Sequence, residues 1–291
     1  MKRITVGLLG AVLASTSVFA QDFSQVNITT IPVTDNIYML QGSGGNIGVS
    51  IGDDGTFIVD DQFAPLTGKI VEAIAALTDK PVDFVVNSHW HYDHSDGNEN
   101  FGKAGAYIVA QDNSRHRMET DQVVSLNGRE QEAYDASGLP KITFMDAMKF
   151  YFNGNTIEIV YTGPGHTDGD AQVYFRESNV LHTGDMFVRY GLPFIDQPNG
   201  GTTSGMIDSL WEIAGLIDDD TIIIPGHGQL AKRSDLLEYR SMLVTIRERL
   251  QAAIAQGQSA DQVVASDVVE GFAAPGAGTE RWVRAAYEEY K

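Results

Sequence analysis

The chain has 291 residues, no cysteine, and a formal net charge of −19 from 39 acidic and 20 basic side chains. Without cysteine, the protein has no disulfides, no thiolate metal ligands and no cysteine nucleophile. So acidic a surface repels phosphate backbones, which argues against nucleic acid as a partner, and the length is ample for a buried core.

Residues 1–20 have the pattern of a secretory signal peptide. Two basic residues, Lys2 and Arg3, precede a short apolar stretch, and small residues end the segment at Ala20. The apolar part is too short to span a bilayer, which needs about 20 apolar residues. We therefore expect cleavage after Ala20. The remaining residues, 21–291, are expected to form one periplasmic domain with no membrane attachment.

The first half of that domain alternates strand and helix patterns. Residues 37–62 alternate apolar and polar side chains around glycine-rich turns, which predicts hairpin strands. Apolar residues at helical spacing predict a helix within 64–81. The apolar run 82–88 predicts a buried strand, and 102–111 predicts another. Segment 112–145 is polar and is interpreted as helical or loop-like.

The second half repeats this alternation. Residues 152–187 have strand patterns, 206–217 form a predicted helix, and TIIIPGHG at 221–228 reads as a buried strand that ends near its histidine. Residues 231–256 predict a long amphipathic helix, so the C-terminal region is expected to be helical. Strands that alternate with helices predict an α/β fold, with sheets in the middle and helices outside.

A cluster of ligand-type side chains follows the strand at 82–88. The segment SHWHYDH places three histidines and an aspartate within six positions, although the chain has only seven histidines. These residues are His89, His91, Asp93 and His94. Alternate residues of a strand share a face, so His89 and His91 are expected to point to one side, with Asp93 and His94 in the turn beyond. Imidazole and carboxylate groups suit zinc, and also iron or manganese.

Three other apolar strands stop at a ligand-type residue beside glycine. They are IEIVYTGPGHTDGD with His166, NVLHTGDMF with Asp185, and TIIIPGHGQL with His227. Glycine allows the backbone to approach a metal closely. One such strand end is a weak signal, but four in one chain predict a metal site. Of the other histidines, His116 is interpreted as a solvated side chain and His182 as a packing or supporting residue.

The ordered motifs HWHYDH, GHTDGD, TGD and PGHG resemble the metallo-β-lactamase superfamily, from about residue 37 to about residue 230. The resemblance implies a four-layer αβ/βα sandwich with two zinc ions in a cleft between the sheets. It also implies that Asp60 orients a ligand from behind. The implied ligands form three sets: His89, His91 and His166 for the first zinc; Asp93, His94 and His227 for the second; and Asp185 as the bridge.

The chemistry implied by this resemblance is hydrolysis of an acyl bond. Two dications that share a water molecule lower its pKa towards about 7. Asp93 is expected to accept a hydrogen bond from this nucleophile, which makes it the candidate catalytic residue. The substrate is expected to be a small molecule, and Arg189, Lys232 and Arg233 are candidates to pair with a substrate carboxylate.

The motifs leave several activities open. The missing cysteine excludes the β-lactamase subclass with a thiolate ligand, and the three-histidine first site is similar to other β-lactamases. Asp185 in TGDMF is instead similar to glyoxalase II. Predicted export favours a periplasmic β-lactamase that acts on a β-lactam or another cyclic amide or ester. The alternatives are a lactonase, a glyoxalase II-like thioesterase, and a binding protein without turnover.

Overall fold

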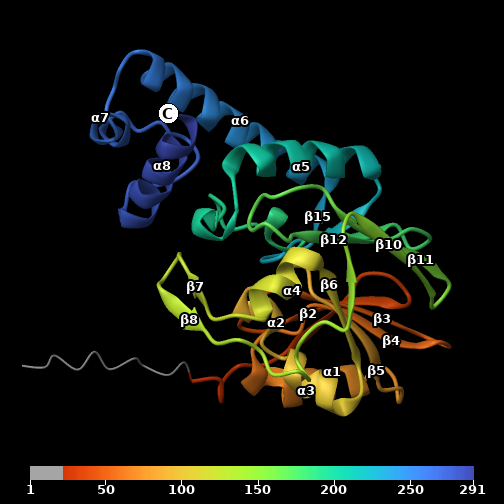
Figure 1. The fold of residues 1–291 in the computed structure, drawn as a ribbon. Coiled ribbons are helices and arrows are strands. Elements are labelled where there is room, and N and C mark those ends of the chain that lie inside the picture. The colour runs from red at the N-terminus through yellow and green to blue at the C-terminus, as the bar shows by residue number, and fades with distance from the viewer. Residues whose placement is uncertain (1–21) are drawn as a thin grey trace, which may run out of the picture.

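Two β-sheets pack face to face in the computed structural model, with helices on both outer faces (Figure 1). This arrangement confirms the predicted four-layer αβ/βα sandwich. The structure describes residues 22–291, so the predicted signal peptide lies outside the described residues. Within that range, no helix has both the length and the apolar content needed to cross a bilayer.

The first sheet has seven strands in the order β1-β2-β3-β4-β5-β6-β9. Their bounds are β1 Thr29–Pro32, β2 Ile37–Gln41, β3 Ile47–Gly52, β4 Gly55–Val59, β5 Val82–Val86, β6 Tyr107–Gln111 and β9 Ile142–Phe144. Strands β1 to β4 pair antiparallel, whereas β4, β5, β6 and β9 pair parallel. The carboxyl ends of β4 and β5 therefore meet at one edge of this sheet.

The second sheet has six strands in the order β10-β11-β12-β13-β14-β15. Their bounds are β10 Ala147–Phe152, β11 Asn155–Tyr161, β12 Ala171–Phe175, β13 Val180–His182, β14 Ile222–Ile224 and β15 Ala231–Lys232. Strand β12 runs antiparallel to β11 and β13, and β13 runs parallel to β14. Strands β11, β13 and β14 consequently end at the same edge of the sheet.

The helices lie outside the sheets or extend the C-terminus (Figure 1). Their bounds are α1 Thr67–Ala75, α2 Tyr92–Ser95, α3 Asn98–Ala104, α4 Asp112–Met118, α5 Thr203–Leu216, α6 Arg233–Ala255, α7 Ala260–Ala265 and α8 Ala277–Tyr290. Three short 3₁₀ helices are η1 Ala64–Leu66, η2 Gly184–Met186 and η3 Gln197–Asn199. The helices predicted within 64–81, 206–217 and 231–256 correspond to α1, α5 and α6.

Apolar side chains fill the three gaps between the four layers. Between the sheets, residues such as Phe57 and Val86 pack with Ile159 and Val173. A second cluster lies under α1 and α3, where Ile70 and Phe101 are buried; a third joins the second sheet to α5 and α6. Burial of apolar surface in all three gaps holds the strand ends in place around the site.

Segment 112–145 contains more strand than the sequence predicted. Besides α4 it forms the hairpin strands β7 (Gln122–Val124) and β8 (Arg129–Gln131), and the edge strand β9. Each of these strands has three residues, and only one of the three is buried. A strand this short with a single inward side chain has no detectable alternation, so the interpretation as helix or loop was wrong for these residues.

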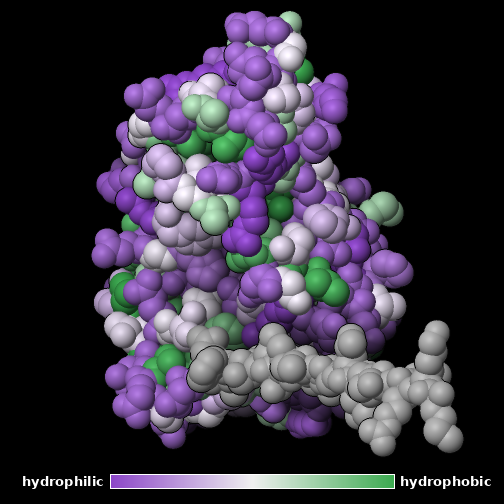
Figure 2. Space-filling model, turned by 90° about the vertical axis from the view of Figure 1, so that its left-hand side faces the viewer, coloured by the Kyte–Doolittle hydropathy of each residue, from purple (hydrophilic) through white to green (hydrophobic). Residues whose placement is uncertain are grey.

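The C-terminal helices α6, α7 and α8 share a fourth apolar cluster. Helix α8 is also fastened to the start of α5, because the Glu289 carboxylate accepts hydrogen bonds from the backbone N–H of Thr203 (2.8 Å) and of Ser204 (2.8 Å). An acidic side chain at a helix N-terminus accepts hydrogen bonds from unpaired N–H groups, and its negative charge is attracted by the positive end of the helix dipole. The face that forms the left-hand side of Figure 1 is largely hydrophilic, as the acidic composition predicts (Figure 2).

Candidate metal centre

The strand ends of both sheets bring the seven candidate ligands together. His89 and His91 follow β5, Asp93 and His94 lie in α2, and His166 follows β11. Like His166, the other two candidates come from the second sheet: Asp185 lies in η2 after β13, and His227 follows β14. Ligand atoms from these residues form three groups, each with atoms within 4.8 Å of one another.

The histidine pair reaches the site from a loop, not from a strand. Strand β5 ends at Val86, and His91 is the extended residue that caps the N-terminus of α2, with φ −62° and ψ 144°. The prediction that His89 and His91 point to one side because they alternate along a strand was therefore wrong, since neither residue lies in a strand. Asp93 and His94 belong to the single turn of α2, so one helical turn presents them on the same side as the pair.

The first group consists of His89, His91 and His166, all buried. The Nε2 atom of His166 lies 3.2 Å from Nε2 of His89 and 2.8 Å from Nδ1 of His91. Three ring nitrogens thus converge on one point. In a tetrahedral zinc site with Zn–N bonds of about 2.0–2.1 Å, neighbouring nitrogens are about 3.3 Å apart, so this group has nearly the spacing of such a site.

The outward ring nitrogens of these histidines are each held by a hydrogen-bonding partner. The partner distances are 3.0 Å from Ser88 Oγ to His89 Nδ1, 2.9 Å from Asp196 Oδ2 to His91 Nε2, and 2.8 Å from the Phe194 carbonyl oxygen to His166 Nδ1. A partner on one ring nitrogen fixes the ring orientation and leaves the other nitrogen free to bind metal.

The second group consists of Asp93, His94 and His227. The Nε2 atom of His227 lies 3.2 Å from Nε2 of His94 and 3.4 Å from Oδ2 of Asp93. Behind this group, Asp60 Oδ2 accepts a hydrogen bond from His94 Nδ1 at 2.8 Å. Asp60 has a left-handed backbone with φ 66°, a strained conformation of the kind that concentrates at functional sites. The structure therefore places Asp60 in the orienting position that the resemblance implied.

Asp185 lies between the two groups. Its Oδ1 atom is 3.2 Å from His94 Nε2 and 3.4 Å from His227 Nε2, while Oδ2 is 3.7 Å from His166 Nε2. Oδ1 is buried and has no hydrogen-bond partner within the described part of the chain. A buried carboxylate oxygen without a hydrogen bond is costly, and a cation shared with the neighbouring imidazoles would compensate it. This donor set fits two zinc ions.

His89 and His166 differ from His227 in their affinity for protons. Burial and the neighbouring histidines lower the pKa of His166 to about 4 and that of His89 well below its usual range. Burial also acts to lower the pKa of His227, but Asp185 outweighs it and raises that pKa to about 9. Neutral imidazole is the ligating form. His89 and His166 are therefore ready to bind metal at neutral pH, whereas His227 must release a proton first.

Close approach of the backbone to Asp185 requires glycine at position 226. A Cβ atom at Gly226 would lie 2.0 Å from Asp185 Oδ1. The backbone N–H of Gly226 also donates to the carbonyl oxygen of Gly184, at 2.8 Å, and its carbonyl accepts from the N–H of Asn46, at 2.7 Å. The loop that carries His227 is thus packed directly on the loop that carries Asp185.

Asp196 is a supporting residue that the sequence did not reveal. It holds His91, and its carboxylate accepts hydrogen bonds from Ser125 Oγ at 2.7 Å and from Asn199 Nδ2 at 2.9 Å. Asp196 stands in the polar loop segment FIDQPNGG, which is not part of any ligand motif. An aspartate in such a loop has no spacing that could have marked it.

Replacing Asp196 by alanine is expected to weaken metal binding by about 10- to 100-fold, the usual cost of losing an outer partner of a ligating histidine. The reason is that His91 loses the group that fixes its ring orientation. Zinc affinity measured by competition with a chromophoric chelator tests this expectation. Asp219→Ala is the matched control, because Asp219 is an exposed carboxylate that pairs with Arg233. Equal zinc affinities of the two variants would contradict the role of Asp196.

The two remaining histidines and the aromatic residues of the motif lie outside the ligand sets. His116 is exposed on α4, whereas His182 is buried and its Nε2 lies 3.0 Å from the carbonyl oxygen of Asn46. Trp90 is buried in a small apolar cluster, and Tyr92 stacks under the guanidinium of Arg129. These aromatic side chains pack the scaffold around the ligands.

The basic residues proposed for substrate carboxylates have other surroundings. Arg189 pairs with Asp235 at 2.9 Å, and Arg233 pairs with Asp219 at 3.0 Å. Lys232 is an exposed residue at the start of α6. The two arginines are therefore engaged in ion pairs of their own, which weakens their candidacy for binding a substrate.

Part of the chain is similar in sequence to curated proteins of known activity. Hydroxyacylglutathione hydrolase from Brucella anthropi is 26% identical over 182 residues, which cover 62% of this chain and 61% of that protein. The chain thus matches about three fifths of the length of this curated relative.

Two solved structures share the fold at low sequence identity. The DIM-1 metallo-β-lactamase superposes with a TM-score of 0.62 at 20% identity, covering 76% of this chain and 99% of that chain. The sec-alkylsulfatase Pisa1 from Pseudomonas sp. superposes with a TM-score of 0.67 at 18% identity, covering 91% of this chain and 50% of that chain. The family model of the metallo-β-lactamase superfamily matches residues 40–227, which contain all seven candidate ligands. The chain belongs to the metallo-β-lactamase superfamily.

Proposed function

We propose that the protein is a zinc-dependent hydrolase that cleaves carboxylic thioesters and esters. The observation that carries the proposal is the position of Asp185, whose two oxygens face both groups of histidines. When bound, two zinc ions would lower the pKa of a shared water molecule and polarise the acyl carbonyl group. The remaining steps depend on side chains of this chain.

Asp93 is the candidate hydrogen-bond acceptor for the attacking water. Burial acts to raise its pKa, but His94 and His227 outweigh burial and hold that pKa at about 2. The carboxylate is therefore ionised at neutral pH and can accept a hydrogen bond from the attacking water, which orients it towards the acyl carbon. Its side chain is 24% exposed, against 7% for Asp185. This difference leaves Asp93 accessible to substrate and Asp185 as a positioning residue.

The charge of the site favours a good leaving group. Asp93 and Asp185 together would neutralise half of the formal charge of two dications, so the electrophilic assistance at the acyl group is moderate. A thiolate leaves readily, because a thiol has a pKa of about 8.5, whereas an amide nitrogen needs stronger assistance. Relatives named hydroxyacylglutathione hydrolase support a thioester reaction.

A β-lactamase is the second candidate. The signal-like segment 1–20 supports action in the periplasm, where β-lactams meet their targets. The strained amide of a β-lactam would also tolerate moderate electrophilic assistance better than an ordinary amide. We propose the periplasmic location for either activity.

A substrate panel tests both candidates. The zinc-loaded protein is expected to hydrolyse acetyl thioesters with a kcat/KM at least about tenfold above that for a chromogenic cephalosporin, which corresponds to about 1.4 kcal/mol in the barrier. A chelator should abolish both activities, and zinc should restore them. A cephalosporin rate above the thioester rate would select the β-lactamase, and background rates on all substrates at full zinc loading would refute both.

A further inference from the structure

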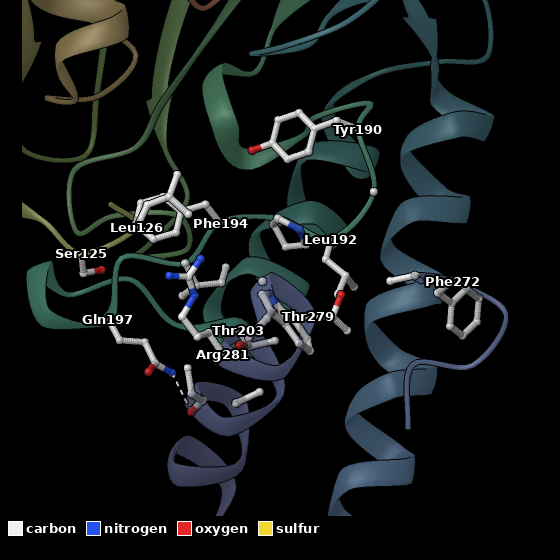
Figure 3. A pocket seen from close by; sticks show the side chains of 18 of the residues that line it. Ser125, Leu126, Tyr190, Leu192, Phe194, Gln197, Thr203, Phe272, Thr279 and Arg281 are labelled. Carbon is white, nitrogen blue, oxygen red and sulfur yellow. Dashed lines mark hydrogen bonds between the residues drawn. The ribbon is translucent and has the colours of Figure 1, made fainter. Parts of the chain in front are cut away.

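A large cavity lies beside the metal centre, between α8, the β7–β8 hairpin and the loop that follows Asp185 (Figure 3). Its volume is about 780 Å³, and its wall is mainly apolar, with contributions from Leu126, Leu192, Phe194 and Phe272. The size and the apolar lining are typical of small-molecule sites. Much of the wall comes from residues 272–286, which lie outside the region that defines the family.

Two aromatic residues belong to both the cavity wall and the surroundings of the metal ligands. The ring of Phe194 is 5.7 Å from the ring of His91 and 5.5 Å from that of His166, and the ring of Tyr190 is 5.7 Å from that of His227. Both residues line the cavity. A molecule that fills the cavity would therefore end next to the ligand groups.

The cavity also contains one basic side chain, Arg281. Figure 3 shows it extending from α8 towards Leu126 and Phe194. Neither an ion pair nor a hydrogen bond joins its guanidinium to any residue between 22 and 291. By contrast, Arg284 on the same helix pairs with Asp261 at 2.7 Å. In a chain of net charge −19, a guanidinium without an acidic partner beside an apolar cavity is suited to an anionic ligand.

We propose that this cavity binds an amphiphilic anion, with its apolar chain against the cavity wall and its anionic group paired with Arg281. This assignment rests on the proposed function in one respect: it makes the natural substrate an acyl compound whose apolar part carries a negative group. Guanidinium recognises carboxylate through two parallel hydrogen bonds. The apolar wall supplies affinity, and Arg281 supplies selection for charge.

Binding of two ten-carbon probes to the full-length, zinc-loaded protein tests the assignment. Decanoate carries the anionic group, and decanol has the same chain without it. Titration calorimetry is expected to show decanoate bound at least about tenfold more tightly than decanol, because hydrogen bonds between charged groups are stronger than those of a neutral hydroxyl group. Arg281→Gln should remove this preference, and Ala285→Phe, which fills the cavity, should weaken both probes at least about tenfold.

Matched substitutions on α8 serve as controls. Arg284→Gln removes an arginine that does not line the cavity, and Ala277→Phe adds the same ring at an exposed position outside it. Both controls should bind the probes within twofold of the unaltered protein, and circular dichroism should show that all four variants fold. If Ala285→Phe fails to fold, Arg281→Gln alone decides the charge preference.

The outcomes separate the cavity from the catalytic proposal. Decanoate binding that is unchanged in Arg281→Gln would overturn the assignment, because the carboxylate would then be bound elsewhere, for example by the metals. Hydrolysis of acetyl thioesters without any binding of the two probes would overturn the ligand assignment of the cavity and leave the proposed function intact. Probe binding that depends on Arg281 in a protein without acyl hydrolysis would support the anion site and refute the proposed function.

Discussion

Replacing His89 by alanine is expected to lower kcat/KM for acyl hydrolysis by more than about a hundredfold. Loss of a residue that only supports a metal ligand costs at most about that factor. His89 is the histidine that takes part in both the group with His91 and His166 and the group with His94 and Asp185. Its loss removes a ligand at the centre of the site, so the bound zinc per chain should fall as well.

The control is His116→Ala, which makes the same substitution at an exposed histidine of α4. This variant should keep its activity and its zinc content. Zinc measured by mass spectrometry and thermal unfolding after chelation would show whether His89→Ala loses metal binding or only stability. Full turnover by His89→Ala with two zinc ions per chain would contradict the ligand assignment.

Much of the site could be predicted because each ligand is marked by a local pattern. His166, Asp185 and His227 all follow an apolar strand and stand near a glycine. The strand directions then bring the loops together, since β11, β13 and β14 end at one edge of their sheet. Such strand ends are visible in sequence, and the fold follows from the order of strands and helices.

The groups that support the ligands were harder to find, because they act over long sequence separations. Asp196 reaches His91 across 105 positions, and the carbonyl oxygen of Phe194 reaches the ring of His166 across 28. No periodicity connects such pairs. The cavity was missed for the same reason: Arg281 lines one cavity with Leu126 and Phe194 only after α8 has packed against the core. Contacts that depend on how layers pack have no local signal.

Replacing Asp185 by asparagine is expected to have the second-largest effect. The substitution keeps the size of the side chain and removes its negative charge, so the packing around Gly226 is preserved. An amide offers a weaker oxygen donor than a carboxylate and cannot neutralise charge. Because the carboxylate faces ligands of both groups, we expect zinc binding at both positions to weaken and kcat/KM to fall by about 10- to 100-fold or more.

Asp93→Asn is the matched variant that distinguishes a bridging carboxylate from one that binds a single zinc ion. Both substitutions remove one charge from the site, but Asp93 contacts only the group that contains His227, whereas Asp185 contacts both groups. Asp93→Asn should therefore weaken the binding of one zinc ion and remove the charged hydrogen-bond acceptor of the nucleophile, whereas Asp185→Asn should weaken the binding of both zinc ions. Zinc titrations would show one changed affinity in the first variant and two in the second. If Asp185→Asn changes the affinity for a single zinc ion, the carboxylate does not bridge the two groups, and the observation that carries the proposed function loses its basis.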